Sequence, residues 1–232
     1  MSDTAPPTKM TKYERTPVVV DVEQSARGAG SMFAAAFCFY HPSGEQFAEV
    51  FYFPEKEGAT ESENTMKFWM ETKEKVAFFE AVHTTGTDGN KLLTRKDAAK
   101  AIRSLIDGLY NFGAPVDFYS DYSAFDMGGV NSLMDEFGYL PINLKSDDAM
   151  ISKVIDHTTL ALGYAKMLPY QSSSLAFKKL GIEKAPKAKD HDPEMDVVAI
   201  MKDVQAVLGA QSLLDVDELP RVFPPEVGVV HE

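Results

Sequence analysis

The sequence predicts an α/β protein whose centre is a mixed five-stranded sheet flanked by helices, with three antiparallel strands followed by parallel ones. Two observations lead to this prediction. Three β-branched or aromatic runs near the start of the chain are separated only by short turns, which is the pattern of antiparallel strands. Further along, short apolar runs alternate with segments of helical periodicity, which is the pattern of parallel strands joined by helices.

A single domain is expected, because 232 residues suffice for one α/β domain with a full core. We place this domain at residues 17–210. Residues 1–16 are polar, offer little to bury and are expected to form a flexible arm. Residues 211–232 hold several prolines and acids, and we expect a tail that packs on the domain.

The composition argues against several classes of protein. A net charge of −12 argues against strong non-specific binding to a nucleic-acid backbone, although a local metal site can still act on one. No apolar run reaches the ~18 residues of a membrane span, so no membrane partner is expected. The single cysteine, Cys38, excludes an internal disulfide, and this suits a reducing, cytoplasmic location.

The first three strands are predicted within residues 18–53. Val18–Glu23 begins with three valines, and a turn at 27–30 follows it. Residues 31–40 are apolar on both alternating faces, which is typical of a central strand covered on both sides. A turn at 41–44 then leads into the returning strand at 47–53.

Helices and parallel strands alternate through the rest of the chain. Helical spacing starts at Met66, pauses after Met70 and resumes at Val76. The most periodic segment runs to Phe112, with Thr94 as its N-cap. The later elements are a strand at 116–120, a helix at 126–137, a strand at 150–156, helical stretches to 168 and at 174–180, and a last helix that is capped by Asp192 and ends near 208.

Four acids stand at equivalent places in these elements. Asp21 and Glu23 end the first strand, and their i, i+2 spacing puts both on one face. Asp126 and Asp196 each lie in the first turn of a helix, and His191 precedes Asp196 by five residues. Open α/β sheets bind ligands at the carboxyl ends of their strands, so these residues are candidates for one site. Neighbouring buried carboxylates repel each other and lose hydration, and a divalent cation offsets both effects.

Each of these residues also has a structural explanation. The acid pair could lie in water at the strand's end. Asp126 could complete a capping box with Ser123, and Asp196 could simply complement the dipole of its helix. His191 could be an exposed loop residue. The functional interpretation is favoured, because the structural explanation requires all of these coincidences to occur at once.

The order and spacing of the motifs resemble the DEDDh family of 3′→5′ exonucleases, within the ribonuclease H-like superfamily, over residues 18–208. The three family motifs are D-x-E after a strand, an aromatic–Asp pair opening a helix, and H-x4-D at another helix entrance. They are matched here by Asp21 and Glu23, by Phe125 and Asp126, and by His191 and Asp196. Residues 66–73 are also similar to a helix of phage and bacterial ribonuclease T-like exonucleases.

One departure from the family pattern is visible. A threonine that usually follows the family's glutamate contacts the terminal nucleotide, and here Gln24 and Ser25 stand in its place, which leaves the substrate preference open. With Phe125 and Lys189, they are the residues expected to contact substrate. His157 offers a second candidate for the third motif, but no Asp stands five residues after it, so His191 is preferred.

The resemblance implies two divalent cations, Mg²⁺ or Mn²⁺, held by Asp21, Glu23, Asp126 and Asp196, with His191 taking a proton from the attacking water. The expected function is metal-dependent 3′→5′ hydrolysis of phosphodiester bonds from the 3′ end of single-stranded nucleic acid or short oligonucleotides. The alternatives are an endonuclease on the same fold and a non-catalytic acidic interaction protein that retains the fold. The sequence does not decide whether the substrate is DNA or RNA, or whether the protein is a monomer or a homodimer.

Overall fold

Five strands form one mixed sheet in the computed structural model, which describes residues 15–26, 30–41, 44–84, 92–111, 116–145, 152–165, 167, 173–186 and 192–211. The strands are β1 (Thr16–Gln24), β2 (Met32–Tyr40), β3 (Gln46–Tyr52), β4 (Val116–Ser120) and β5 (Lys153–Asp156), in the spatial order β3-β2-β1-β4-β5. The β1–β2 and β2–β3 pairs are antiparallel, and the β1–β4 and β4–β5 pairs are parallel. The predicted sheet is therefore confirmed.

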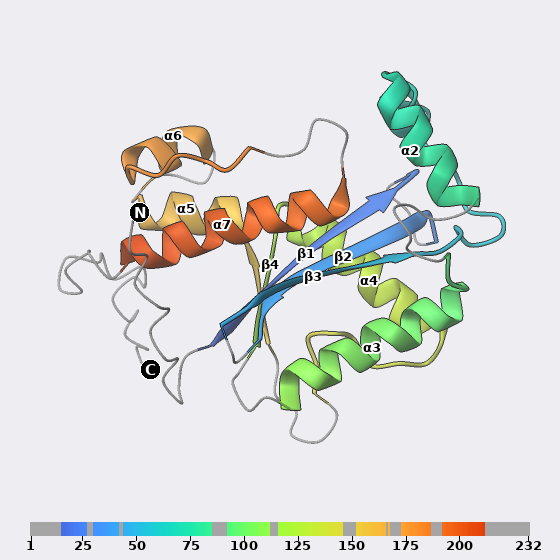
Figure 1. The fold of residues 1–232 in the computed structure, drawn as a ribbon, viewed down its shortest axis with the longest axis horizontal. Coiled ribbons are helices and arrows are strands. Elements are labelled where there is room, and N and C mark those ends of the chain that lie inside the picture. The colour runs from blue at the N-terminus through green and yellow to red at the C-terminus, as the bar shows by residue number, and fades with distance from the viewer. Residues whose placement is uncertain are drawn as a thin grey trace, which may run out of the picture.

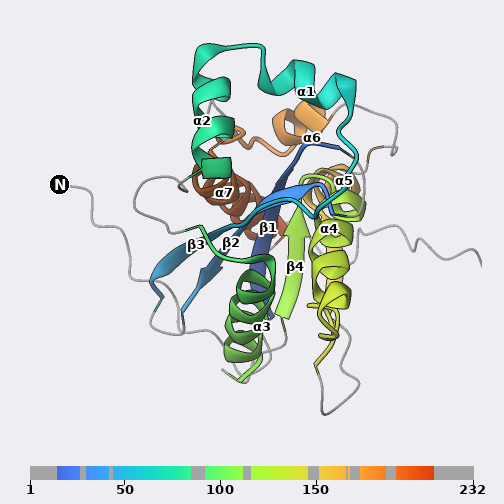
Figure 2. The same cartoon turned by 90° about the vertical axis from the view of Figure 1, so that its right-hand side faces the viewer.

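Seven helices flank this sheet within the part of the chain that the structure describes. They are α1 (Glu63–Trp69), α2 (Lys73–Thr84), α3 (Arg95–Asn111), α4 (Ser123–Glu136), α5 (His157–Tyr164), α6 (Ser173–Lys179) and α7 (Pro193–Gln211). The long α7 crosses one face of the sheet, with α5 and α6 on its side, whereas α3 and α4 cover the other face (Figure 1). The α1–α2 pair lies beyond the end of the sheet at which β1 ends (Figure 2).

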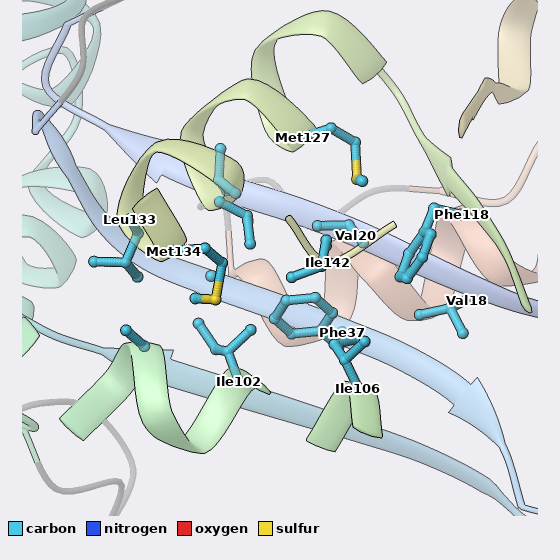
Figure 3. Packing of buried hydrophobic residues seen from close by; sticks show 14 of the residues in the cluster. Val18, Val20, Phe37, Ile102, Ile106, Phe118, Met127, Leu133, Met134 and Ile142 are labelled. Carbon is cyan, nitrogen blue, oxygen red and sulfur yellow. The ribbon is translucent and has the colours of Figure 1, made fainter. Parts of the chain in front are cut away.

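The alternation of side chains along β1 separates the two cores. Val18 and Val20 belong to the core beneath α3 and α4, as Figure 3 shows, whereas Val19 packs with residues of α7 on the opposite face. Successive side chains of a strand point to opposite faces, so Asp21 and Glu23 share the face of Val19. The acid pair therefore points to the side of the sheet that α7 covers.

The predicted helix starts at Thr94 and Asp192 are confirmed. The Thr94 hydroxyl accepts a hydrogen bond from the Asp97 N–H at 3.1 Å, and Asp192 Oδ1 accepts one from the Glu194 N–H at 3.0 Å. Such bonds satisfy backbone donors that have no partner inside the helix. Among the helices described, none combines the length and apolar character that a membrane span requires.

The pause in helical spacing after Met70 corresponds to a break between α1 and α2. Trp69 ends α1 with its ring buried, and the Thr72 hydroxyl accepts from the Lys75 N–H at 3.2 Å, which starts the next helix. Of the expected arm and tail, only Arg15, Thr16 and Gln211 lie within the described residues, so the domain limits stay a prediction.

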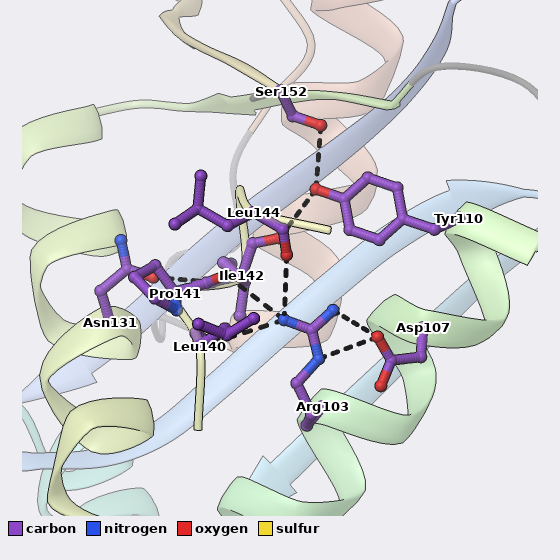
Figure 4. Close-up of polar contacts among 9 residues, drawn as sticks. All are labelled: Arg103, Asp107, Tyr110, Asn131, Leu140, Pro141, Ile142, Leu144 and Ser152. Carbon is purple, nitrogen blue, oxygen red and sulfur yellow. Dashed lines mark hydrogen bonds and ion pairs between the residues drawn. The ribbon is translucent and has the colours of Figure 1, made fainter. Parts of the chain in front are cut away.

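A polar network attaches the connection between α4 and β5 to α3 (Figure 4). Arg103 Nη2 lies 2.6 Å from Asp107 Oδ1, and Nη1 donates to three carbonyl oxygens between residues 140 and 144. The Tyr110 hydroxyl donates to the Ile142 carbonyl at 2.9 Å. These bonds satisfy polar groups of a connection that has little regular structure.

Candidate metal site and its cleft

Three of the predicted acids converge near the carboxyl end of β1. Asp21 and Glu23 come from β1 and Asp196 from the first turn of α7, and each offers a carboxylate oxygen within 4.8 Å of the other two. Their exposed fractions are only 9%, 7% and 2%. The sequence separates Asp196 from the pair by the rest of the domain, so the fold creates this cluster.

The local structure of β1 gives the acid pair room. The residues paired with Asp21 and Glu23 on β2 are Ala36 and Ala34, whose small side chains leave space on the same face. The register then shifts between Glu23 and Gln24. Such irregularities change the direction of side chains and are frequent beside active sites.

Packing of α7 brings Asp196 to the acid pair. Val197, Ile200 and Met201 pack on the sheet face that carries Val19. The Asp196 N–H donates to the Asp192 carbonyl at 2.9 Å, so Asp196 belongs to the first turn of the helix. A carboxylate in this position is stabilised by the helix dipole.

Asp126 is the fourth predicted acid, and the group of carboxylates within 4.8 Å of one another does not include it. Its Oδ2 accepts a hydrogen bond from the Tyr122 N–H at 3.2 Å, so it closes the first turn of α4 onto the backbone, although Ser123 is not its partner. It is also buried and lines one cleft with the other three acids. This cleft has a volume of about 260 Å³ and is lined by Asp21, Val22, Glu23, Gln24, Thr65, Phe68, Trp69, Asp121, Tyr122, Phe125, Asp126 and Asp196.

A second open hollow of about 610 Å³ adjoins the acid cleft. It is lined by Ser62, Asn64, Thr65 and Phe68, of which Thr65 and Phe68 also line the cleft. The two hollows therefore follow each other along α1. Their combined volume is large enough to hold more than one small polar chemical group, such as a phosphate or a sugar.

The donor set of the cluster suits a hard divalent cation. Three buried carboxylates within 4.8 Å repel one another and lose hydration, and a positive charge between them offsets both effects. Carboxylate oxygens are the ligands that Mg²⁺, Mn²⁺ and Ca²⁺ prefer. Asp21, Glu23 and Asp196 can therefore bind a metal ion, and Asp126 lies in the same cleft.

The remaining predicted residues are placed differently. Gln24 and Phe125 line the cleft, and Gln24 Oε1 accepts from the Ser31 hydroxyl at 3.4 Å. Ser25 is fully buried and is not among the residues that line the cleft, and its backbone is bonded to Ser31 and Ser62. Its role as a substrate contact stays a prediction. His191 and Lys189 lie outside the described residues, and their roles stay predictions.

Sequence reasoning missed several residues of the cleft. Asp121 directly follows β4, and Asp21 and Glu23 lie in the last part of the neighbouring β1, so its place in the chain could have identified it. Thr65 and Phe68 carry no such signal, because only the folding of α1 over the end of the sheet brings them to the cleft.

No protein-family model matches the sequence, and no curated protein matches it significantly. Among solved structures, Escherichia coli exonuclease I bound to a dT13 oligonucleotide superposes with a TM-score of 0.56 at 16% identity, over 86% of this chain and 42% of that one. The zinc-bound complex of E. coli exonuclease I with single-stranded DNA superposes with a TM-score of 0.57 at 16% identity, over 86% of this chain and 41% of that one. Product-bound exonuclease I superposes with a TM-score of 0.56 at 15% identity, over 86% of this chain and 45% of that one.

These likenesses define the class of fold. The chain has the ribonuclease H-like fold that the exonuclease I structures share. It spans less than half the length of those proteins. At 15–17% identity the similarity establishes this architecture, and the activity has to be argued from the site.

Proposed function

We propose that this chain is a metal-dependent nuclease of the DEDDh type, which removes nucleotides from the 3′ end of single-stranded nucleic acid or short oligonucleotides. The observation that carries the proposal is the meeting of Asp21, Glu23 and Asp196 within 4.8 Å in an open cleft. The fold supports it, because exonuclease I structures of this fold were solved with single-stranded oligonucleotides.

The four acids are assigned to two divalent cations, Mg²⁺ or Mn²⁺. When bound, such ions stabilise the charge that develops on a phosphodiester group and make a water nucleophilic near neutral pH. Asp21, Glu23 and Asp196 contribute the clustered oxygens. The Tyr122 N–H donates to Asp126 Oδ2, and Asp126 lines the same cleft as the three clustered acids.

Other residues of the cleft suit a nucleic-acid strand. Tyr122 is largely exposed and Phe125 lines the cleft, so both offer aromatic faces on which bases can stack. The adjoining hollow along α1 offers room for a second nucleotide. His191 remains the predicted base that takes the proton from the attacking water.

The decisive experiment compares Asp196→Asn with the unaltered protein on 5′-labelled single-stranded DNA and RNA, with Mg²⁺ or Mn²⁺. The unaltered protein is expected to shorten the strands stepwise, one nucleotide at a time, and to lose this activity in EDTA. Asp196→Asn should lower the rate by more than about 100-fold, because it removes a direct metal ligand. Asp135→Asn, which changes an exposed acid of α4, is the matched control and should leave the rate unchanged.

The same assay separates the alternatives. Internal cuts in place of stepwise shortening would support an endonuclease on this fold. An absence of cleavage on every substrate, together with no rise in melting temperature in Mn²⁺, would favour the non-catalytic interaction protein. A metal that binds the native state raises stability by about 2.7 kcal/mol at 100 times its Kd.

A further inference from the structure

A buried histidine lies directly behind the wall of the acid cleft. His157 is the first residue of α5 and is only 1% exposed. Its Nδ1 lies 2.9 Å from Asp121 Oδ1 and 3.3 Å from the Ser120 carbonyl oxygen. On the other side of the ring, Nε2 lies 3.8 Å from Oδ2 of the buried Asp203. The imidazole thus stands between two carboxylates.

The atoms that surround the His157 ring show which of its two nitrogens makes a hydrogen bond. Both atoms that face Nδ1 are acceptors, so this nitrogen carries the hydrogen and donates it to Asp121 and Ser120. Nε2 makes no hydrogen bond in the described part of the chain, since Asp203 lies beyond hydrogen-bond distance. The firm contact of His157 is therefore with Asp121.

Asp121 connects this buried pair to the cleft. It directly follows β4, lines the cleft with the four proposed metal ligands, and has a side chain that is 27% exposed. His157 is too deeply buried to touch anything in the cleft, so it can act there only through Asp121. One Asp121 oxygen is held by the histidine, while the side chain still reaches the cleft.

The chemistry of a carboxylate limits what Asp121 can bind. An ionised carboxylate accepts hydrogen bonds and donates none. In a nucleic-acid strand the phosphates are anionic acceptors, whereas sugar hydroxyls and the N–H groups of bases are donors. A fixed carboxylate on the cleft wall therefore suits the nucleoside part of a substrate.

We propose that Asp121 is a further substrate-binding residue, which accepts a hydrogen bond from the nucleoside of the terminal nucleotide, and that His157 is the positioning residue that fixes its carboxylate. This inference rests on the proposed function, because that function places a nucleotide in the cleft. It adds to it a contact outside the four metal ligands.

Two substitutions of His157 form a matched pair. His157→Asn places a side-chain amide near the position of Nδ1 and keeps the donor to Asp121. His157→Gln places the amide near the position of Nε2 and loses that donor. Both remove the ring, so a purely structural role for the histidine predicts similar effects from the two.

The measurement is kcat and KM for release of the terminal nucleotide with Mn²⁺, together with the melting temperature. His157→Gln and Asp121→Asn should each raise KM by about 10-fold or more, the effect of losing a hydrogen bond to a charged group. His157→Asn should stay within about threefold of the unaltered protein. The variant that combines His157→Gln with Asp121→Asn should be no worse than Asp121→Asn alone, since both break one contact.

Equal loss in the Asn and Gln variants, with KM unchanged in Asp121→Asn, would overturn the inference. If neither His157 variant folds, Asp121→Asn decides whether Asp121 binds the nucleoside, because the Asp121 side chain is partly exposed. An unaltered protein that cleaves and depends on Asp196, but whose KM is insensitive to Asp121→Asn, contradicts only this inference. An unaltered protein without cleavage contradicts the proposed function, and this inference with it.

Discussion

His83 is a titratable residue outside the cleft, and its contacts change its pKa. It lies on α2 with Nδ1 2.7 Å from the Phe79 carbonyl oxygen and Nε2 3.6 Å from Glu55 Oε1. Partial burial by itself lowers the pKa of His83, but the contacts with Glu55 and Phe79 and the charge of Glu61 outweigh burial and raise this pKa above its usual value. Folding therefore favours the protonated imidazole.

This shift predicts a pH dependence of stability. A histidine whose pKa is higher in the folded state contributes stability that is fully present below about pH 6.5 and is lost as the pH rises through the folded-state pKa. Glu55→Gln should therefore destabilise the protein more at pH 6 than at pH 9. The difference should be on the order of 0.5 kcal/mol, because the contact is partly exposed and is screened by water.

Urea unfolding of Glu55→Gln at several pH values, beside the unaltered protein, measures this difference. Glu57→Gln changes an exposed acid of the same segment and should show no comparable trend. A Glu55→Gln effect that is equal at pH 6 and pH 9 would show that Glu55 does not raise the pKa of His83.

At the scale of elements, a glycine in α4 allows this helix to pack close to β1. A Cβ added at Gly129 would lie 2.9 Å from Gln24 Nε2 and 3.3 Å from Met32 Sδ. The neighbouring Gly128 has no atom within 4 Å of such a Cβ. The two glycines lie in one helix interior but face different surroundings, so they form a natural comparison.

Gly128→Ala should stabilise the protein by about 0.5–1 kcal/mol, since alanine loses less backbone entropy than glycine in a helix. Gly129→Ala should lose that gain to crowding and displace the Gln24 side chain in the floor of the cleft. Urea unfolding measures the first effect and the KM for oligonucleotide the second. Equal stabilisation by both variants would mean that Gln24 moves away without strain.

At the scale of the whole molecule, α7 joins the core to the site. The same helix supplies Asp196 at its start and packs Val197, Ile200 and Met201 on the sheet. The position of one metal ligand therefore depends on apolar packing along the helix. Stability and site geometry are coupled through this element.

Ile200→Ala is expected to lower the free energy of unfolding by about 2–5 kcal/mol, the usual effect of emptying a buried aliphatic position. Met195→Ala, at an exposed position on the same helix, should change it by less than about 0.5 kcal/mol. Equilibrium unfolding in urea measures both, and Mn²⁺ should still raise the melting temperature of Ile200→Ala because Asp196 is intact. A loss from Ile200→Ala no larger than that from Met195→Ala would contradict the packing role of α7.

Most of the fold was predictable because its signals are local. The alternation in β1, the periodicity of α3 and the caps at Thr94 and Asp192 each depend on residues a few positions apart, and each agrees with the structure. The position of α1 over the end of the sheet was not predictable from the sequence. It depends on the burial of Trp69 against partners distant in the chain.

The sequence by itself determined the mixed sheet, its helices and the four acids at the ends of elements, since hydrophobic periodicity and capping act over a few residues. Tertiary structure alone decided that Asp21, Glu23 and Asp196 lie within 4.8 Å, that Ser25 is buried, and that His157 stands behind Asp121. The reason is physical: a site is defined by distances through space, and these are set only when helices and sheet pack into one core.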